Sequence, residues 1–313
     1  MGAKTGISWT EKTWNYIRGC SEKSSGCANC YARLMAARFS GPGQPYEGLA
    51  FMNKEGKSHW TGKIVAVPSM LDQPIRWQTP SLIFVNSMSD LYHEDIEFNA
   101  IVNAYEVMET ANWHIYQTLT KRAELLNEYR SKITLKSGRN LAKDPLPHEW
   151  VGVSIENEAT ARERSKFLGE CNAAIRWISV EPLVGNIDWE RMLAESKANW
   201  VVFGGESRQG EADVCREMPL SWVREGLNAC NKFGVTAFVK QLGYWSAKSV
   251  LRPEKFAADP SGKKPFCWPD DIKVQDYPVD LVAALPKNRK HGKMSKVIPL
   301  DVIHIVNNGK DVA

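Results

Sequence analysis

Three cysteines crowd into one short segment near the start of the chain, in the run GCSEKSSGCANCYAR: Cys20, Cys27 and Cys30. Thiolates are soft ligands that suit zinc, copper(I) and iron–sulfur clusters, so this spacing indicates a metal site. The chain has seven cysteines, an odd number, and no export signal, which predicts a reduced, cytoplasmic setting and no disulfide framework. The other four stand singly, and we expect them to be small buried hydrophobes or ordinary thiols: Cys171, Cys215, Cys230 and Cys267.

Two kinds of metal chemistry fit the three thiols. A structural zinc site takes four ligands, so it needs a fourth from a histidine or a distant cysteine. The nearest histidine after Cys30 is His59, in a segment rich in Gly, Pro and Trp. A [4Fe–4S] cluster held by three thiolates, by contrast, keeps one iron open for a substrate or cofactor. The residues alone leave both chemistries open.

The segments around the cysteines predict an α/β fold, a partial or complete (β/α) TIM-type barrel of six to seven parallel strands. Short apolar runs of the kind found in buried parallel strands alternate with amphipathic helical patterns. The strands are expected at 14–19, 81–90, 113–121, 150–157, 174–182, 199–207 and 236–243. The helices are expected at 30–39, 94–111, 122–130, 157–170 and 219–233. The cysteines lie between the first strand and the first helix, which places them at the mouth of the barrel.

Polar residues gather where these strands end, and in a barrel those ends converge on one mouth where active sites form. We expect the barrel to span residues 1–245, with an irregular insertion at about 41–80. Residues 246–313 form a C-terminal extension that carries a basic segment, 286–296. That segment is either a solvated loop or a contact for nucleic acid or a partner.

The composition is that of an ordinary soluble protein. It is 43% hydrophobic and 24% charged, with a formal net charge of +4. No apolar run reaches the ~18–20 residues that a membrane-spanning helix needs, so we expect no membrane contact. The mild basic excess permits nucleic-acid binding without arguing for it, because binding depends on a local patch.

The cysteine segment resembles a known superfamily. A three-cysteine motif directly after the first strand of a (β/α) barrel is similar to the radical S-adenosylmethionine proteins, whose usual spacing is C-x3-C-x2-C. Here the spacing is C-x6-C-x2-C. The runs WNYIRGC, GCANCYARL, VNSMSDLYH, TLTKR and VGVSIEN resemble the spore photoproduct lyase-like branch.

With VVFGGESR and FVKQLG added, the pattern over residues 5–245 most closely resembles a phage-associated family of radical-S-adenosylmethionine-like proteins. That family is often encoded beside a three-Cys-motif partner protein. The resemblance implies a [4Fe–4S] cluster on Cys20, Cys27 and Cys30, and S-adenosylmethionine on the open iron. The cofactor would give a 5′-deoxyadenosyl radical after one electron arrives from an external donor.

The resemblance also assigns roles around the mouth. Cofactor-binding positions are Asn29 and Tyr31 beside the adenine; Ser87, Ser89 and Asp90 beside the methionine part; and Lys121, Ser154, Glu156 and Glu181. Substrate-side catalytic candidates are Glu206 and Lys240, and Cys215 is a candidate hydrogen-atom donor. Gly204 and Gly205 are expected to allow a close backbone approach.

The expected substrate is a nucleic acid or nucleotide that is modified or repaired. The basic segment and the twelve tryptophans, some of which could stack on bases, support it. Two alternatives stay open. One is a zinc-binding or catalytically silent barrel that binds a partner. The other is a radical enzyme with a peptide or small-molecule substrate.

Overall fold

Seven parallel strands form one sheet, as the sequence predicts, and the sheet stays open. The computed structural model describes residues 5–207 and 215–280. The strand order is β1-β6-β7-β8-β9-β10-β11, and the edge strands β1 and β11 do not pair with each other. The partial form of the predicted barrel is therefore the one observed. The strands are β1 (Lys12–Trp14), β6 (Leu82–Val85), β7 (Ile115–Thr120), β8 (Glu149–Ser154), β9 (Ile175–Val180), β10 (Trp200–Gly204) and β11 (Thr236–Gln241).

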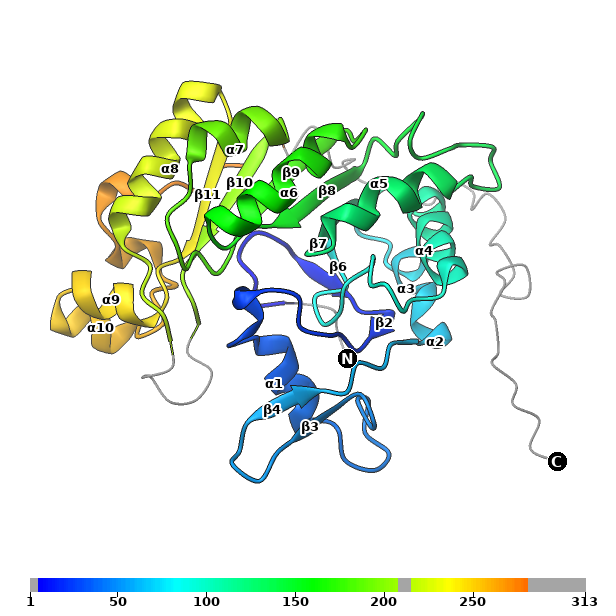
Figure 1. Cartoon of the computed structure of the whole chain (residues 1–313), viewed down its shortest axis with the longest axis horizontal. Helices are drawn as coiled ribbons and strands as arrows, with labels where there is room; N and C mark the ends of the chain where they lie inside the picture. The colour runs from blue at the N-terminus through cyan, green and yellow to red at the C-terminus, as the bar shows by residue number, and fades with distance from the viewer. Residues whose placement is uncertain (1–4, 208–214, 281–313) are drawn as a thin grey trace.

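Five helices connect these strands and lie along the outer side of the sheet, as Figure 1 shows. They are α4 (Phe98–Thr110), α5 (Ala123–Lys132), α6 (Glu158–Glu170), α7 (Trp189–Ser196) and α8 (Leu220–Phe233). Four of them match predicted helical patterns. The helix α7 is short and was not predicted. Asn157 and Thr160 form a capping box that fixes the start of α6 directly after β8.

Alternate residues of each strand pack against different layers. Val151 and Val153 of β8 face the helices, whereas Trp150 faces the interior of the half-barrel with Trp177 and Trp200. The ring centroids of Trp177 and Trp200 are 5.4 Å apart. All twelve tryptophans are buried or half-buried, so the predicted base-stacking role has no exposed indole to support it. Four of the indoles, those of Trp9, Trp150, Trp177 and Trp200, pack together in the interior of the half-barrel.

The cysteine segment and the insertion lie on the opposite side of the sheet from these helices (Figure 1). Helix α1 (Tyr31–Arg38) packs against a hairpin of β3 (Ala50–Met52) and β4 (Ser58–Trp60). The short strands β2 (Ile17–Arg18) and β5 (Val65–Ala66) pair, and a 3-10 turn, η1, spans Ser25–Cys27. The helices α2 (Pro68–Leu71) and α3 (Gln73–Arg76) lead to β6.

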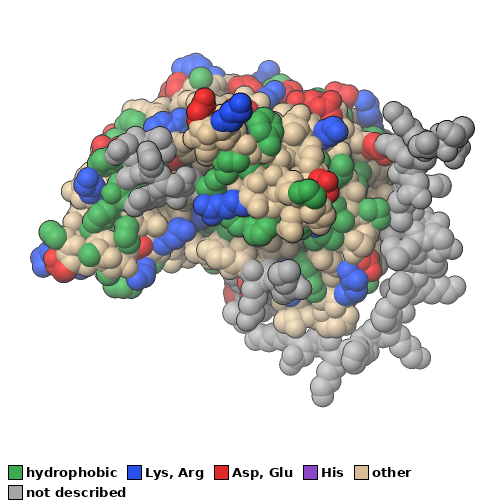
Figure 2. Space-filling view, turned by 90° about the horizontal axis from the view of Figure 1, so that it is seen from below, with side chains coloured by type: hydrophobic (Ala, Val, Ile, Leu, Met, Phe, Trp, Pro, Cys, Tyr) green, Lys and Arg blue, Asp and Glu red, His purple; other side chains and the backbone are tan. Residues whose placement is uncertain are grey.

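The segment after β11 holds α9 (Tyr244–Val250), α10 (Pro253–Ala258) and the turns η3 (Pro265–Cys267) and η4 (Asp270–Ile272). It returns to the interior of the half-barrel, where Tyr277 stacks on Trp200 with 5.6 Å between ring centroids. The predicted basic segment 286–296 lies outside the described residues. Within residues 5–207 and 215–280, no helix is long and apolar enough to cross a membrane. Lys and Arg side chains are interspersed with acidic and hydrophobic ones on the face shown in Figure 2.

Candidate active site

One pocket at the carboxyl ends of the strands collects most of the predicted site residues. Its polar lining includes all three clustered cysteines and ten of the other candidates, and its apolar floor includes Trp9, Phe84 and Leu119. The predicted residues that line it are Cys20, Cys27, Asn29, Cys30, Tyr31, Ser87, Ser89, Asp90, Lys121, Ser154, Glu181, Glu206 and Lys240. Glu156 lies under the cysteine segment, and Cys215 is buried beside Ser207, with its Sγ 3.7 Å from the Ser207 carbonyl oxygen.

The three thiols lie close enough to influence one another. Burial raises the pKa of Cys20 to about 12, and the thiols of Cys30 and Cys27 add to that rise. Burial also raises the pKa of Cys30, although the backbone N–H groups of Arg33 and Ala32, at the start of α1, oppose it. The positive end of a helix therefore faces one thiol, which favours negative charge there. Among the described residues, no group of three or more His, Cys, Asp or Glu side chains is placed to hold a single metal ion.

The six-residue gap between Cys20 and Cys27 packs closely over the end of β8. Ser24 Oγ donates to Glu156 Oε1 over 2.9 Å. A Cβ built on Gly26 would lie 2.5 Å from Glu156 Cγ, so the backbone approaches that side chain as closely as only glycine allows. The unusual spacing of this motif is therefore accommodated by a docked segment.

Glu156 is fully buried, and two cations hold its charge. Lys121 Nζ pairs with Oε1, and Arg164 Nη1 lies 3.2 Å from Oε2. Burial opposes ionisation of Glu156, but Lys121 and Arg164 outweigh it and keep the pKa of this carboxyl below its usual value. Lys121 and Glu156, both predicted as cofactor-binding, thus bind each other in this structure.

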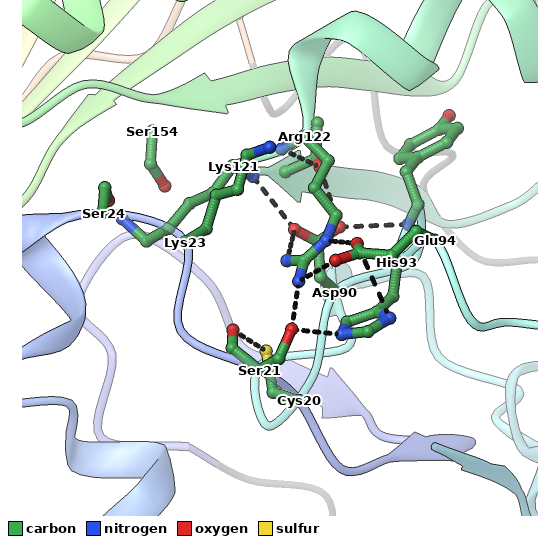
Figure 3. A network of polar contacts seen from close by, with 12 residues as sticks. Cys20, Ser21, Lys23, Ser24, Asp90, His93, Glu94, Lys121, Arg122 and Ser154 are labelled. Atoms are coloured by element: carbon green, nitrogen blue, oxygen red, sulfur yellow. Dashed lines mark hydrogen bonds and ion pairs between the residues drawn. The ribbon is translucent and has the colours of Figure 1, made fainter. Parts of the chain in front are cut away.

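A second buried network follows β6 and β7 (Figure 3). Asp90 accepts from Thr120 Oγ1 at 2.7 Å and from the Lys121 backbone N–H at 3.0 Å. Arg122 Nη1 lies 3.3 Å from Asp90 Oδ2, and Arg122 Nη2 donates to Ser21 Oγ over 2.7 Å. The predicted cofactor residue Asp90 is therefore engaged with protein groups, and it ties the strand ends to the residue that follows Cys20.

The first helix brings Tyr31 to the rim of the pocket. Its hydroxyl donates to the Ser87 carbonyl over 2.7 Å, while its side chain stays exposed. Ser87 Oγ donates to Asn15 Oδ1 at 3.1 Å, and Ser89 Oγ donates to the Ile17 carbonyl at 2.9 Å. Both serines therefore join the β6 end to the strand segments that precede the cysteines.

Glu206 does not present a free carboxylate to a substrate. Its Oε2 accepts from Asn29 Nδ2 at 2.9 Å, and its Oε1 accepts from Arg216 Nη2 at 2.5 Å. Arg216 Nη2 also donates to the Ser25 carbonyl over 3.0 Å. Burial opposes ionisation, but Arg216 keeps the pKa of Glu206 below its usual value. Both Asn29, predicted beside the adenine, and Glu206, predicted as catalytic, hold the cysteine segment against β10.

The remaining polar pair lines the pocket at the ends of β9 and β11. Lys240 Nζ pairs with Glu181 Oε1, and both side chains are mostly buried. Gln241 Nε2 donates to Ser207 Oγ at 2.6 Å. A Cβ on Gly205 would lie 2.0 Å from the Leu242 carbonyl oxygen, so the absence of a side chain lets this backbone approach the segment that follows β11.

The sequence reasoning missed the arginines that hold the cysteine segment. Arg33 is buried and bonds to Glu22, to the Ala28 carbonyl at 2.5 Å and to Ser58 Oγ at 3.3 Å. Arg122 bonds to Ser21 and Arg216 to the Ser25 carbonyl, whereas Arg164 acts through Glu156, which accepts from Ser24. Arg33 and Arg122 belong to the runs CYAR and TLTKR, which carry the resemblance. The resemblance assigns roles to Tyr31 and Lys121 in these runs, but not to the two arginines.

Another missed residue is Asn86, which lines the pocket in a left-handed backbone conformation with φ of 58°. Its Oδ1 accepts from the Ile17 backbone N–H at 3.4 Å. Its buried Nδ2 has no hydrogen-bond partner within the described part of the chain. A buried donor without an acceptor costs free energy unless a bound molecule supplies one.

The chain belongs to the family described as "Protein of unknown function (DUF5131)", whose sequence profile matches residues 4–280. No curated protein shows a significant match to the sequence. Among solved structures, the chain is similar to a mutant of spore photoproduct lyase, with a TM-score of 0.45 and 11% identity over 76% of this chain and 78% of that one. It is also similar to spore photoproduct lyase complexed with dinucleoside spore photoproduct, with a TM-score of 0.44 and 12% identity over 76% and 80% of the two chains.

Proposed function

We propose that this chain is a radical S-adenosylmethionine enzyme whose [4Fe–4S] cluster is held by Cys20, Cys27 and Cys30. The observation that carries the proposal is that one short segment brings all three thiols to the same pocket, at the carboxyl ends of the strands. This is the mouth where a half-barrel places its chemistry. The bound cluster and cofactor would together supply a carbon-centred radical that abstracts a hydrogen atom from the substrate.

The donor set fits such a cluster. A four-iron cluster takes each thiolate on a different iron, so its ligands must surround a volume instead of meeting at one ion. Three thiols around a pocket meet that need, and three ligands leave one iron open. The N–H groups of Ala32 and Arg33 face the Cys30 thiol, which suits an anionic cluster. The unpartnered amide of Asn86 offers a donor to a bound cofactor.

In this proposal, residues of the chain anchor the cysteine segment, contact the adenine of the cofactor and contact the substrate. Lys121 and Glu156 anchor the cysteine segment from below, and Asn29 with Glu206 anchors it from the β10 side. Tyr31 supplies an exposed ring at the rim for an adenine face. The Lys240–Glu181 pair presents a donor and an acceptor to a polar substrate group. Cys215 is not among the residues that line the pocket, so the proposal does not assign it the role of hydrogen-atom donor.

We further propose a nucleic acid or nucleotide as the substrate, in a phage or mobile-element setting with the three-Cys-motif protein as a partner. The resemblance of the runs VNSMSDLYH, TLTKR and VGVSIEN to the lyase-like branch supports this substrate class. The test is binding of single-stranded and double-stranded DNA and RNA at several salt concentrations. A nucleic-acid substrate predicts binding that weakens steeply with salt. No binding of DNA or RNA at low salt would contradict a nucleic-acid substrate and favour a peptide or a small molecule.

The metal itself is the primary test. The protein is purified anaerobically, reconstituted with iron and sulfide, and analysed for iron, sulfide and zinc. We expect about four irons per chain, with the iron–sulfur absorbance lost in Cys27→Ala and kept in Cys230→Ala. Cys230 is a matched control because it is buried in α8, away from the pocket. One zinc and no iron per chain would contradict the radical enzyme and favour the alternative, a zinc-binding barrel that binds a partner.

A further inference from the structure

A buried ion pair holds the residue that follows the first cysteine (Figure 3). Arg122 Nη2 donates to Ser21 Oγ over 2.7 Å, and Nη1 lies 3.3 Å from Asp90 Oδ2. Arg122 is 1% exposed and Asp90 is 5% exposed, so neither charge is screened by water as a surface charge is. Glu94 pairs with the other edge of the guanidinium, and its side chain is half-exposed.

Further hydrogen bonds hold Asp90 and the neighbouring His93. Asp90 Oδ1 accepts from Thr120 Oγ1 at 2.7 Å and from the Tyr92 backbone N–H at 3.0 Å. His93 Nδ1 accepts from the Asp95 backbone N–H at 3.1 Å, so Nε2 carries the proton and donates to Ser21 Oγ at 2.8 Å. The hydroxyl of Ser21, the residue next to Cys20, therefore accepts hydrogen bonds from both Arg122 and His93.

Cys20, Asp90 and Arg122 line the same pocket, and Arg122 bonds to the residue next to Cys20. A buried anion disfavours negative charge at a nearby sulfur, and a buried cation favours it. One-electron reduction adds one negative charge to a cluster that Cys20 binds. A buried cation nearby makes that step easier and a buried anion makes it harder, because net charge near a cluster sets its reduction potential.

We propose that Asp90 and Arg122 are positioning residues that set the reduction potential of the cluster from the side of Cys20. The inference rests on the proposed function, because it requires a cluster on the three cysteines. It replaces the cofactor-binding role predicted for Asp90. An uncharged hydrogen-bond donor could also hold Ser21. A role in setting the potential gives a reason for a buried charged pair at this place.

The experiment measures the midpoint potential of the anaerobically reconstituted full chain. Dithionite and mediator dyes set the potential, and electron paramagnetic resonance reports the reduced cluster. Arg122→Gln leaves Asp90 unbalanced and is expected to shift the potential downward. Asp90→Asn leaves Arg122 unbalanced and is expected to shift it upward. Arg122→Lys keeps the charge and is expected to stay closest to wild type.

The half-exposed Glu94 supplies a variant that does not open the buried pair. Glu94→Gln removes a negative charge from the same network and is expected to shift the potential upward, so it decides the question if the buried variants fail to take up iron. Shifts of the same sign in Arg122→Gln and Asp90→Asn, or unmoved potentials at full iron content, would overturn this inference alone. A wild-type protein that binds no iron would overturn the proposed function and this inference with it.

Discussion

Gly26 and Glu156 lie in contact although they are far apart in the sequence, one in the cysteine segment and one after β8. A Cβ on residue 26 would lie 2.5 Å from Glu156 Cγ and 2.7 Å from its Oε1. Because Glu156 is held by Lys121 and Arg164, it cannot move aside at low cost. Because Cys27 is the next residue and also lines the pocket, we expect this contact to position the Cys27 thiol.

Gly26→Ala is therefore expected to lower iron uptake more than it lowers fold stability. The added methyl overpacks a tight contact, which typically costs about 1–3 kcal/mol, and displacement of the 20–30 segment relieves it. Iron per chain after reconstitution and the thermal midpoint measure the two effects. Gly41→Ala is the control, because its nearest neighbour is Gln44 Cγ at 3.8 Å. Full iron content in Gly26→Ala would show that the contact does not position the cysteines.

Glu156→Gln is expected to destabilise the protein by about 3–5 kcal/mol near neutral pH, because it leaves the buried Arg164 and the partly buried Lys121 without their counter-charge. The pKa of Glu156 is lowered in the folded chain from a usual value of 4.5, so its ionised form stabilises the fold above that value. This stabilisation falls away as the pH drops below 4.5 through the lowered pKa. Urea unfolding measured from pH 7 down to pH 3.5 should therefore show that the difference in free energy of unfolding between wild type and variant narrows only at the acidic end.

Asn86→Asp is expected to weaken S-adenosylmethionine binding without loss of iron. The substitution keeps the size of the side chain and its tolerance of a positive φ, but exchanges the unpartnered amide donor for an acceptor. A lost hydrogen bond of about 1–3 kcal/mol corresponds to roughly a fivefold to hundredfold rise in Kd. Calorimetry on the reconstituted protein measures it. An unchanged Kd would remove Asn86 from the cofactor site.

The sequence predicted the scaffold well, because hydrophobic runs report burial directly. Six of the seven apolar runs became strands of the sheet, and their polar ends met at one pocket. The first run, 14–19, was placed too late in the chain, because it shares only Trp14 with β1 and otherwise covers β2, which pairs with β5 outside this sheet. The openness of the sheet could not be predicted, because it depends on whether β1 reaches β11. The short helix Trp189–Ser196 was missed, since eight residues give a weak periodic signal.

The cysteines could be located from spacing alone, but the roles of their neighbours could not. Their residue types made Glu206, Asp90 and Lys121 candidates for binding a cofactor or substrate. In the structure, each of them binds another protein group. Those pairings join residues from different strand ends, and a single sequence carries no signal of which cation meets which carboxylate. Buried arginines such as Arg33 and Arg122 look like ordinary surface residues until the fold encloses them.

The most direct test of the central claim is the electron paramagnetic resonance spectrum of the reduced, reconstituted protein before and after adding S-adenosylmethionine. A site-differentiated cluster on Cys20, Cys27 and Cys30 predicts a reduced-cluster signal whose g values change when the cofactor binds the open iron. The Cys230→Ala variant should behave like wild type. A reduced-cluster signal that S-adenosylmethionine leaves unchanged, in protein with full iron content, would contradict the account.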